Sequence, residues 1–453
     1  MAISERPFPQ TFDWTSFETF RFLGREIDSQ GIITLRYALD DAIEFVEKYE
    51  LPVATQVSDE DRSRVDGILA LLHWIAGVSY FKTTVPRAVE CDPVPPAVAS
   101  LLEATYSEGL GEFAFTNNLA ALPRPRFPKA QVSKGSPPRR QTERILVPVG
   151  GGKDSAVALE AVRKSGREFS LFSVGDAGPI KRTATVAGAP HLIVRRHLDP
   201  QIGELNRAGA LNGHVPITAI ISCVAVLTAS LHGFDAVAMA NERSASAGNV
   251  NWNGIDVNHQ FSKSLRAERL LRAALEDLRA DVDYFSILRP ASELSIARAF
   301  SRMTEYHEAF SSCNTNFRLD GKAPSQRWCC NCPKCRFVYL VLAPHSTPGH
   351  MREIFGRDML EDDSQFEGFA LLTASGGLKP FECVGEEEES RIAMRMLVAD
   401  PRWRDHRVVR RFASEILPRF QGDDAAIEDA FSLSDDHNIP AELMPAVRAL
   451  LAT

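Results

Sequence analysis

The 453-residue sequence lacks the features that mark secreted, membrane-spanning and nucleic-acid-coating proteins. Residues 1–10 form no apolar run, so we expect no secretory signal. The most apolar stretch, residues 217–231, is too short to span a bilayer and carries Thr218 and Ser222, which predicts a buried helix. The sequence has no excess of positive charge, because it contains 51 Lys and Arg residues and 59 Asp and Glu residues. The resulting net charge of −8 argues against a broad surface for binding nucleic acid. These absences predict a cytoplasmic protein without a membrane or nucleic-acid partner, and they leave its oligomeric state open.

Cysteine is also sparse, with eight residues in the chain, and its distribution is uneven. A long chain without a signal segment and with clustered cysteines is typical of metal binding in a reducing compartment. The spacing C-x15-C-x2-C-x2-C suits a tetrahedral thiolate zinc site, with Cys330 left over; the predicted ligands are Cys313, Cys329, Cys332 and Cys335. Two alternatives stay open: Cys330 in place of Cys329, and an iron–sulfur cluster in place of zinc.

The motif Gly150-Gly-Gly-Lys-Asp-Ser155 follows a β-branched run and precedes a helical pattern. Glycines allow close backbone approach, and a helix N-terminus offers free N–H groups, so this unit predicts an anion site. A Walker A loop is excluded, because Val147 stands at its first glycine and Asp154 at its hydroxyl position. The dinucleotide pattern is excluded by Ser155 at its last glycine.

The order of the elements predicts an α/β protein with four parts. We expect an N-terminal α/β domain (1–121) with a hairpin formed by residues 21–27 and 32–39, and a mostly helical region (346–453). The Pro- and Arg-rich residues 122–142 are either a linker or a basic flap. Residues 143–345 alternate between strands and helices, which predicts a doubly wound parallel sheet; its candidate strands are residues 145–149, 169–174, 192–194, 236–240 and 284–288.

Ligands of such sheets bind where the strands end, so residues that follow a strand are candidates. After the predicted strands come Arg195 and Arg196 and then a polar segment, residues 241–264, whose candidate substrate contacts are Asn241, Arg243 and Ser244. If a helix begins near His259, this histidine and Lys263 share one face of it. A run of glutamates at 386–389 predicts the solvated start of a helix.

The glycine motif resembles the S-G-G-x-D-S loop of the ATP pyrophosphatases, with Gly150 in place of the usual serine. These enzymes split ATP into AMP and pyrophosphate, and the resemblance implies their PP-loop, or HUP-like, core. A narrower resemblance is carried by five motifs: Asn241-Glu-Arg-Ser-Ala-Ser, Asn258-His-Gln-Phe-Ser-Lys-Ser264, Asn212-Gly-His-Val-Pro216, Trp328-Cys and Lys379-Pro-Phe-Glu-Cys-Val-Gly385. Together they resemble the UDP-N-acetylmuramoyl-L-alanyl-L-glutamate epimerases of peptidoglycan precursor synthesis, the MurL family.

The resemblance implies ATP-dependent inversion of the terminal L-Glu of UDP-MurNAc-L-Ala-L-Glu. Adenylation would turn the carboxylate into an ester-like group, so that loss of the α-proton gives an enolate that fixed donors can hold. From their positions, the pyrophosphate would be held by Gly150, Gly151, Gly152 and Ser155, with Lys153 countering its charge. Mg²⁺ would bind Asp154 and Glu242, and Arg195 and Arg196 would clamp a substrate carboxylate or phosphate.

The residues that move the α-proton are not ranked by the sequence. The candidates are His214, His259, Lys263 and Cys383. Two rival functions share parts of the pattern: an ATP pyrophosphatase that modifies tRNA or a nucleobase, and a zinc protein that senses nucleotides. The first should present a basic face, and the second should bind ATP without turning it over.

Overall fold

The computed structural model describes residues 12–52, 59–130, 143–317, 326–375, 380–420 and 424–451. The chain divides into two compact units, each discontinuous in sequence. The first contains residues 1–141, 193–235 and 266–283, and the second contains residues 142–192, 236–265 and 284–453. Of the stretch predicted as a linker or flap, residues 131–142 lie outside the described part.

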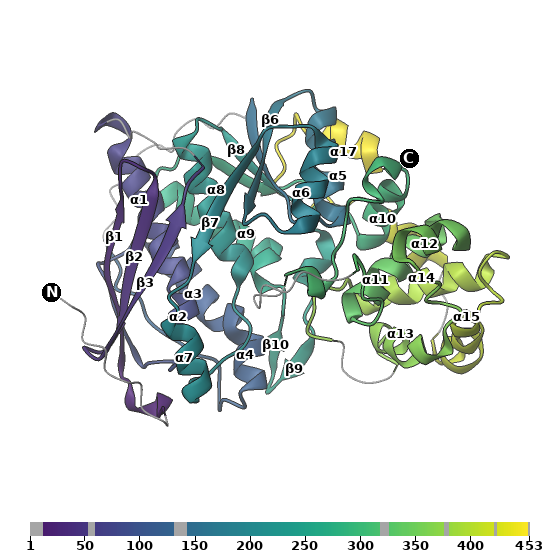
Figure 1. The fold of residues 1–453 in the computed structure, drawn as a ribbon, viewed down its shortest axis with the longest axis horizontal. Coiled ribbons are helices and arrows are strands. Elements are labelled where there is room, and N and C mark those ends of the chain that lie inside the picture. Colours follow the sequence, from purple (N-terminus) through teal and green to yellow (C-terminus); the bar gives the residue numbers. More distant parts are fainter. Residues whose placement is uncertain are drawn as a thin grey trace. The chain divides into compact units, whose positions relative to one another are not determined.

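An antiparallel meander forms the sheet of the first unit (Figure 1). Its strands are β1 (Thr19–Ile27), β2 (Ile32–Leu39) and β3 (Ile43–Glu50), and β4 (Ala88–Glu90) pairs parallel to β1. The predicted hairpin is confirmed: the Asp28 carboxylate accepts from the N–H groups of Gln30 and Ile32, and Gly31 has a φ of 82°. Residues 195–197 of β7 (His191–His197) pair antiparallel with β3.

The α-helices of the first unit share its core. They are α1 (Asp59–Ala76), α2 (Val78–Phe81), α3 (Pro96–Ser107), α4 (Gly111–Thr116), α7 (Gln201–Ala208), α8 (Ile217–Leu231) and α9 (Leu265–Asp277). Helix α1 packs on the meander, and α8 and α3 pack on α1. Fully buried aromatic rings fill the space between, among them Tyr37 stacked on Tyr80 at 4.9 Å between ring centroids. The apolar helix predicted at residues 217–231 is confirmed as α8. No helix in the described ranges is both long enough and apolar enough to cross a membrane.

A parallel arrangement organises the second unit. Its strands lie in the order β11-β8-β5-β6, with bounds β5 (Arg144–Pro148), β6 (Glu168–Val174), β8 (Ala236–Met239) and β11 (Asp283–Ser286). β5 pairs parallel with both β6 and β8, as the alternating pattern predicts. A small antiparallel pair, β9 (Val250–Trp252) and β10 (Ile255–Val257), stands apart from this sheet. The α/β class is therefore confirmed, and the assignment to the PP-loop fold stays a prediction.

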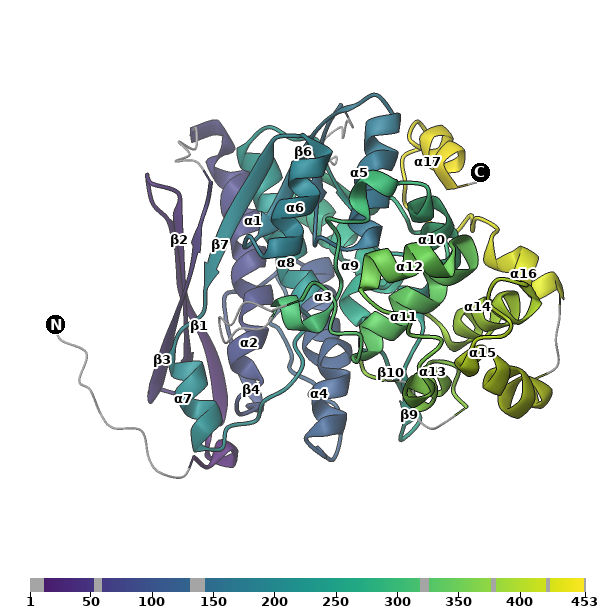
Figure 2. The same cartoon turned by 45° about the vertical axis from the view of Figure 1, so that its right-hand side comes forward.

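Helices make up most of the C-terminal part of this unit, as predicted (Figure 2). The α-helices of the second unit are α5 (Lys153–Lys164) and α6 (Gly178–Ala187) between its strands, and then α10 (Glu293–Ser301), α11 (Pro333–Leu342), α12 (Pro348–Phe355), α13 (Phe366–Leu372), α14 (Glu387–Ala399), α15 (Arg407–Arg411), α16 (Asp424–Ala430) and α17 (Met444–Leu451). Helix α11 contacts α10, α13 and α14, and α5 contacts α10 and α17. One continuous apolar core joins the sheet to these helices.

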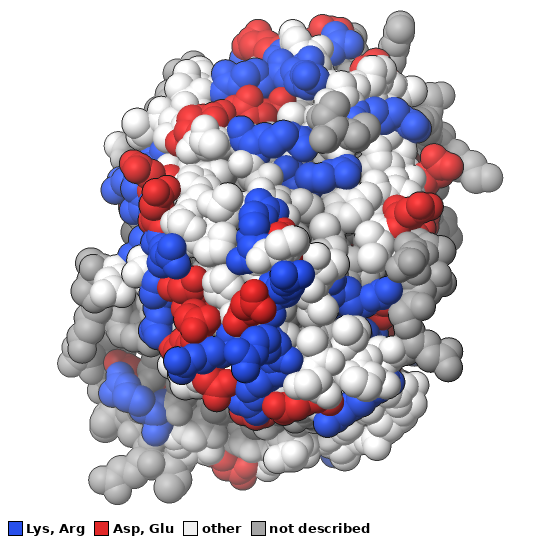
Figure 3. Space-filling model, turned by 90° about the vertical axis from the view of Figure 1, so that its right-hand side faces the viewer, with Lys and Arg blue, Asp and Glu red and all other residues white. Residues whose placement is uncertain are grey.

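Both signs of charge are interleaved on the face drawn in Figure 3. Ion pairs in the C-terminal helices include Arg407 with Glu361 at 3.3 Å and Arg411 with Glu415 at 2.8 Å. Alternating charges of this kind cancel at a distance, so this face offers no broad attractive field to a polyanion.

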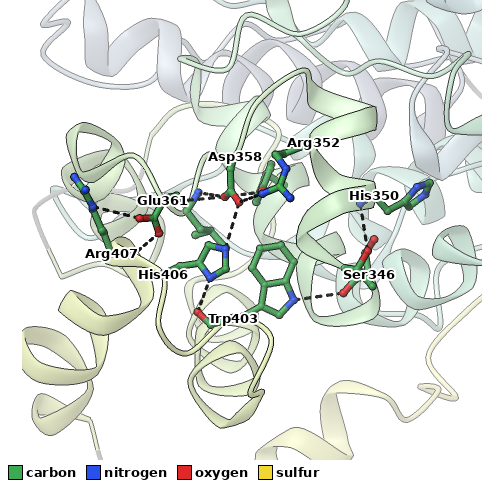
Figure 4. A network of polar contacts seen from close by, with 11 residues as sticks. Ser346, His350, Arg352, Asp358, Glu361, Trp403, His406 and Arg407 are labelled. Carbon is green, nitrogen blue, oxygen red and sulfur yellow. Dashed lines mark hydrogen bonds and ion pairs between the residues drawn. The ribbon is translucent and has the colours of Figure 1, made fainter.

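A polar network ties three of these helices together (Figure 4). The Asp358 carboxylate accepts from Tyr339 of α11 at 3.2 Å and from Arg352 of α12 at 3.2 Å, and it lies 3.3 Å from His406, which precedes α15. The bond to Asp358 raises the pKa of His406 above its ordinary value. Burial alone would raise the pKa of Asp358, but His406 and Tyr339 lower it.

We expect Asp358→Asn to lower the free energy of unfolding of this unit by about 1–3 kcal/mol, because a mostly buried ion pair loses its anion. The contribution of His406 to the free energy of unfolding is complete below pH 6.5, and it is lost as the pH rises through the raised pKa of His406 in the folded protein. The contribution of Asp358 to the free energy of unfolding is complete above pH 3.8, and it is lost as the pH falls through the lowered pKa of Asp358 in the folded protein. Denaturant unfolding should therefore give the largest difference between about pH 4 and pH 6.5. Asp405→Asn is the control, because its pair with Arg404 is exposed, and an equal loss in both variants would contradict the role of Asp358.

Candidate active site

The glycine motif forms a tight loop between β5 and α5. Gly151 has a φ of 80°, and a Cβ there would lie 2.6 Å from the backbone of Pro179, so no larger residue fits. A Cβ on Gly152 would lie 2.7 Å from the Ser312 Oγ. At Gly150, by contrast, nothing stands within 4 Å of such a Cβ, and the backbone there faces open space. The loop is therefore built for close approach of a ligand to its backbone.

Helix α5 begins at Lys153 directly after this loop. Gly152 caps it without a side-chain hydrogen bond, so its first N–H groups are not satisfied by a capping side chain. The Ser155 hydroxyl donates to the Gly152 carbonyl at 2.9 Å. An anion at this end would receive the free N–H groups and the positive end of the helix dipole.

Lys153 is almost completely buried, and its ammonium group pairs with two carboxylates. Its Nζ donates to Asp154 at 2.5 Å and also to Glu293 at the start of α10. Burial alone would lower the pKa of Lys153, but the two carboxylates raise it. This lysine therefore stays charged and fixes the position of Asp154 beside the glycine loop. Its predicted contact with pyrophosphate stays a prediction.

Four carboxylates are close enough to act on one another here. Burial, together with Asp154, Glu242 and Glu389, raises the pKa of Glu293 well above its ordinary value, although Lys153 opposes this. Glu242 is 4% exposed, and within the described residues no hydrogen bond or ion pair engages its carboxylate. A buried carboxylate needs compensation, and carboxylate oxygen is the ligand that Mg²⁺ prefers. Asp154 and Glu242 thus fit a magnesium site in their chemistry.

Glu389 holds two helix starts together. Its carboxylate accepts from the N–H of Glu386 at 3.1 Å, in a capping box of α14, and from the N–H of Glu293 at 2.7 Å, at the start of α10. Burial and the nearby Glu386 and Glu242 raise its pKa to about 7. The predicted helix start is confirmed, but Glu389 is 6% exposed, so the prediction of a solvated run is wrong for this residue. The reason is that it caps a second helix far along the chain.

Arg289 links the loop after β8 to Lys263. Its guanidinium donates to the backbone carbonyl of Glu242 at 2.6 Å and to that of Lys263 at 2.6 Å. The side chain is 2% exposed, so these bonds are shielded from water. One guanidinium therefore fixes Glu242 and Lys263 relative to each other.

Three of the four proton-transfer candidates meet in the second unit. Cys383 is hydrogen-bonded by His259 and by Lys263. Burial alone would raise the pKa of Cys383, but Lys263, His259 and Lys334 lower it to about 6. Burial alone would lower the pKa of Lys263, but Cys383, Glu242 and Asp154 raise it. At neutral pH the group is therefore a thiolate beside an ammonium.

Asn249 joins the segment that carries Cys383 to His259. Its side-chain amide donates to the Pro380 carbonyl at 3.1 Å and accepts from the His259 N–H at 2.9 Å. Gln260 supports the same contact, because it donates to the Val384 carbonyl at 3.5 Å and accepts from Lys263 at 3.3 Å. The polar segment after β8 is therefore a scaffold for Cys383.

This geometry differs from the predicted helix near His259. A short turn of 3₁₀-helix covers Phe261–Lys263, and α9 begins only at Leu265. His259 and Lys263 therefore do not share a helix face, and that prediction is wrong. Asn258 explains the difference, because its side chain accepts from the Gln260 N–H at 2.7 Å and holds the chain in a turn.

The cysteine cluster has the dimensions of a thiolate metal site. One sulfur from each of Cys313, Cys329, Cys332 and Cys335 lies within 4.8 Å of the others. The Sγ atoms of Cys329 and Cys335 are 3.7 Å apart, and tetrahedral zinc with Zn–S bonds of about 2.3 Å requires about 3.8 Å. Cys330 turns away, and its thiol donates to the Phe355 carbonyl at 3.3 Å. Cys332 also caps α11, so the cluster is joined to the helix core.

Three predicted residues belong to the first unit. Arg195 and Arg196 lie inside β7 and not after it, because the strand extends to His197 through its pairing with β3. The Arg196 guanidinium is bonded to the buried Glu47 at 2.6 Å and to the Ser79 hydroxyl at 2.9 Å. His214 lies 3.7 Å from the Glu112 carboxylate. Their predicted roles toward substrate stay predictions.

The residues predicted directly after β8 lie beside the site. The Asn241 amide donates to the Ser286 hydroxyl at 3.1 Å, and the Arg243 N–H donates to the Ala291 carbonyl at 3.0 Å. The Ser244 hydroxyl is buried without a partner in the described part of the chain. Asn241 and Arg243 therefore join the loop after β8 to the end of β11 and to the segment that follows it.

Glu293, Glu389 and Arg289 are functional candidates that the sequence reasoning missed. Arg289 and Glu293 follow β11, so the rule of residues after strands could have found them. Glu389 had no such signal, because its burial depends on contact with α10.

The site combines an anion loop, paired carboxylates, and a thiolate with two cationic or donor neighbours. A helix N-terminus and a carboxylate-bound cation can hold and polarise phosphate groups. A thiolate beside such a site can act as a base or as a nucleophile.

Comparison with known proteins gives consistent matches over most of the chain. The family model of the MurL N-terminal domain matches residues 11–287, and that of the MurL C-terminal domain matches residues 309–427. A UDP-N-acetyl-alpha-D-muramoyl-L-alanyl-L-glutamate epimerase of Xanthomonas oryzae is 41% identical over 447 residues, 97% of this chain and 99% of that protein. A protein of the same name from Salinispora tropica is 45% identical over 404 residues, 86% of this chain and 87% of the relative. A third, from Micromonospora, is 42% identical over 436 residues, with 93% and 96% covered.

Proposed function

The chain belongs to the MurL family, and we propose that it inverts the terminal L-Glu of UDP-MurNAc-L-Ala-L-Glu to D-Glu in peptidoglycan precursor synthesis. The observation that carries this proposal is 41% identity to the Xanthomonas epimerase over 97% of the chain. The enzyme is then an isomerase, and its substrate is a small nucleotide-linked peptide. Because ATP and UDP-linked precursors are cytoplasmic, we place the enzyme there.

We further propose that ATP activates the substrate before inversion. A free carboxylate resists loss of the neighbouring α-proton, because the resulting carbanion would stand beside a full negative charge. The substrate carboxylate attacks the α-phosphorus of ATP, and pyrophosphate leaves. The acyl adenylate that remains has no charge on its carbonyl, so removal of the α-proton gives an enolate that donors can stabilise.

The glycine loop supports this placement of ATP. Its backbone faces open space at Gly150, and α5 begins directly after the loop, so the first N–H groups of this helix lie at the end of the loop. Lys153 fixes Asp154 there, and Glu242 supplies a second carboxylate without an ion-pair partner in the described residues. Asp154 and Glu242 would hold Mg²⁺, which supplies positive charge to the phosphates.

Inversion and release complete the cycle. A base removes the α-proton from one face, and a proton is returned to the other face. Water then attacks the acyl carbon, AMP leaves, and the carboxylate is restored. ATP and water are consumed and AMP and pyrophosphate are formed, while the substrate changes only its configuration.

The test is an incubation of the protein with UDP-MurNAc-L-Ala-L-Glu, ATP and Mg²⁺. We expect D-Glu in the hydrolysed product only when ATP is present, with at least one AMP per inversion. A parallel incubation with tRNA should release no AMP. Inversion without ATP would remove the adenylation step, and AMP release with tRNA alone would replace the proposal with the rival modifying enzyme.

A further inference from the structure

Cys383 has the surroundings of a reactive thiolate and not of a buried structural cysteine. It is partly exposed, and both His259 and Lys263 direct hydrogen bonds to it. The contacts of Asn249 with Pro380 and His259 hold the segment that carries Cys383 against His259. No other described cysteine outside the metal cluster has a lysine and a histidine bonded to it.

The same cluster is connected to the nucleotide loop. Arg289 holds the backbone of Lys263 and of Glu242 with one guanidinium. The charge of Lys263 interacts both with Cys383 and with Asp154 of the glycine loop. A substrate carboxylate activated over that loop would therefore place its α-carbon, one bond away, toward Lys263 and Cys383.

Among the three clustered side chains, Cys383 is the group whose negative charge the other two stabilise. Lys263 stays an ammonium, because Cys383, Glu242 and Asp154 outweigh the effect of burial on its pKa. The bond from His259 lowers the pKa of Cys383, so the ring donates to the sulfur. Both neighbours are then donors to a single acceptor, the sulfur of Cys383.

We propose that Cys383 is the catalytic base that removes the α-proton of the terminal L-Glu, and that Lys263 and His259 are positioning residues that keep its sulfur ionised and aimed. This inference rests on the proposed function. In the step, the C–H electron pair becomes the enolate, and the proton passes to sulfur to give the thiol. The proton on the opposite face comes from a second, solvent-exchanged group, and Cys383 returns its own proton to solvent.

Three neighbouring side chains, Lys263, His259 and Lys334, favour the ionised state of Cys383. Lys263 and His259 lie on the segment after β10, and Lys334 lies in the first turn of α11. Glu382 is the adjacent acid on the loop, but its carboxylate is engaged by the Asn314 amide at 2.7 Å. The proton-abstraction rate should therefore rise with pH through about 6 and then level off.

The decisive variants are Cys383→Ser and Cys383→Ala, compared with wild type in D₂O. Wild type should incorporate deuterium at the α-carbon and form D-Glu. Both variants should still form AMP and pyrophosphate from the L-Glu substrate, but α-deuteration and inversion should fall by at least about 100-fold. Cys91→Ser is the matched control, because that half-buried thiol has a raised pKa of about 11, and it should retain both reactions.

A second variant tests the positioning role. In Lys263→Gln the pKa of Cys383 should rise by about one unit or more, since it loses its strongest cationic neighbour. The acid limb of the deuteration profile should move to higher pH by the same amount, and activity should recover at high pH. Thiolate absorbance, corrected with Cys383→Ser, should titrate in parallel. A merely structural lysine would lower the rate at every pH and leave the profile in place.

The outcomes separate this inference from the proposed function. If wild type inverts the substrate and Cys383→Ala does so at an equal rate, the base is another group and the inference is wrong. A quenched wild-type reaction that carries the glutamyl group on Cys383 by mass spectrometry would make this residue a nucleophile and would also overturn it. If wild type itself neither inverts nor exchanges, the proposed function fails first.

Discussion

Asp154→Asn is expected to reduce AMP formation by more than about 100-fold while the protein stays folded. Asp154 lies in the first turn of α5, where the glycine loop ends, and Lys153 holds its carboxylate. As an amide it could neither bind Mg²⁺ strongly nor pair with Lys153, so pyrophosphate would depart from a poorly neutralised site. The fold should persist, because Glu293 still pairs with Lys153.

The measurement is AMP release with ATP, Mg²⁺ and substrate, together with circular dichroism of the same samples. Glu168→Gln is the control, because this exposed residue at the start of β6 pairs with Arg144 on the surface. It should keep the wild-type rate. Wild-type AMP release by Asp154→Asn would show that the glycine loop does not bind the pyrophosphate.

Cys332→Ser is expected to lose the metal and to lower the free energy of unfolding by more than about 4 kcal/mol. Cys332 is both a member of the cysteine cluster and the N-cap of α11, and α11 lies in the core of the second unit. Loss of the metal would leave the remaining thiolates close together without a cation. Stability should suffer more than any single catalytic step.

The metal of the purified protein should be about one zinc per chain, and the protein should be colourless. Cys330→Ser is the matched control, since its sulfur lies outside the cluster and a serine hydroxyl can also donate to Phe355. Metal analysis and denaturant unfolding should therefore be normal for this variant. A brown protein would contain an iron–sulfur cluster instead, and metal loss in Cys330→Ser would reassign the fourth ligand.

The features that the sequence predicted well are those with local causes. The hairpin after β1 depends on Asp28 and Gly31, which are three residues apart. The glycine loop depends on adjacent residues that lie between a strand and a helix. The cysteine cluster depends mainly on Cys329, Cys332 and Cys335, which lie close together in the sequence. Neighbours in sequence are neighbours in space, so their spacing carries the geometry.

The spacing of residues within one segment does not predict how segments far apart in the sequence pair with each other. The sequence predicted that residues 195–197 follow a short strand as a loop. In the structure, pairing with β3 extends β7 through these residues, and Arg196 is buried against Glu47. The glutamates at 386–389 were predicted to be solvated, but contact with α10 buries Glu389. In both cases the deciding partner lies far along the chain.

From the sequence alone came the α/β class, the glycine loop between a strand and a helix, the cysteine cluster and four unranked proton-transfer candidates. The tertiary structure alone decided which of these candidates share one place, because contacts of Asn249 and Gln260 join the segment that carries Cys383 to the one that carries His259 and Lys263. It also decided their charge states. A thiol becomes a thiolate when cations surround it, and those cations come from segments that only folding brings together.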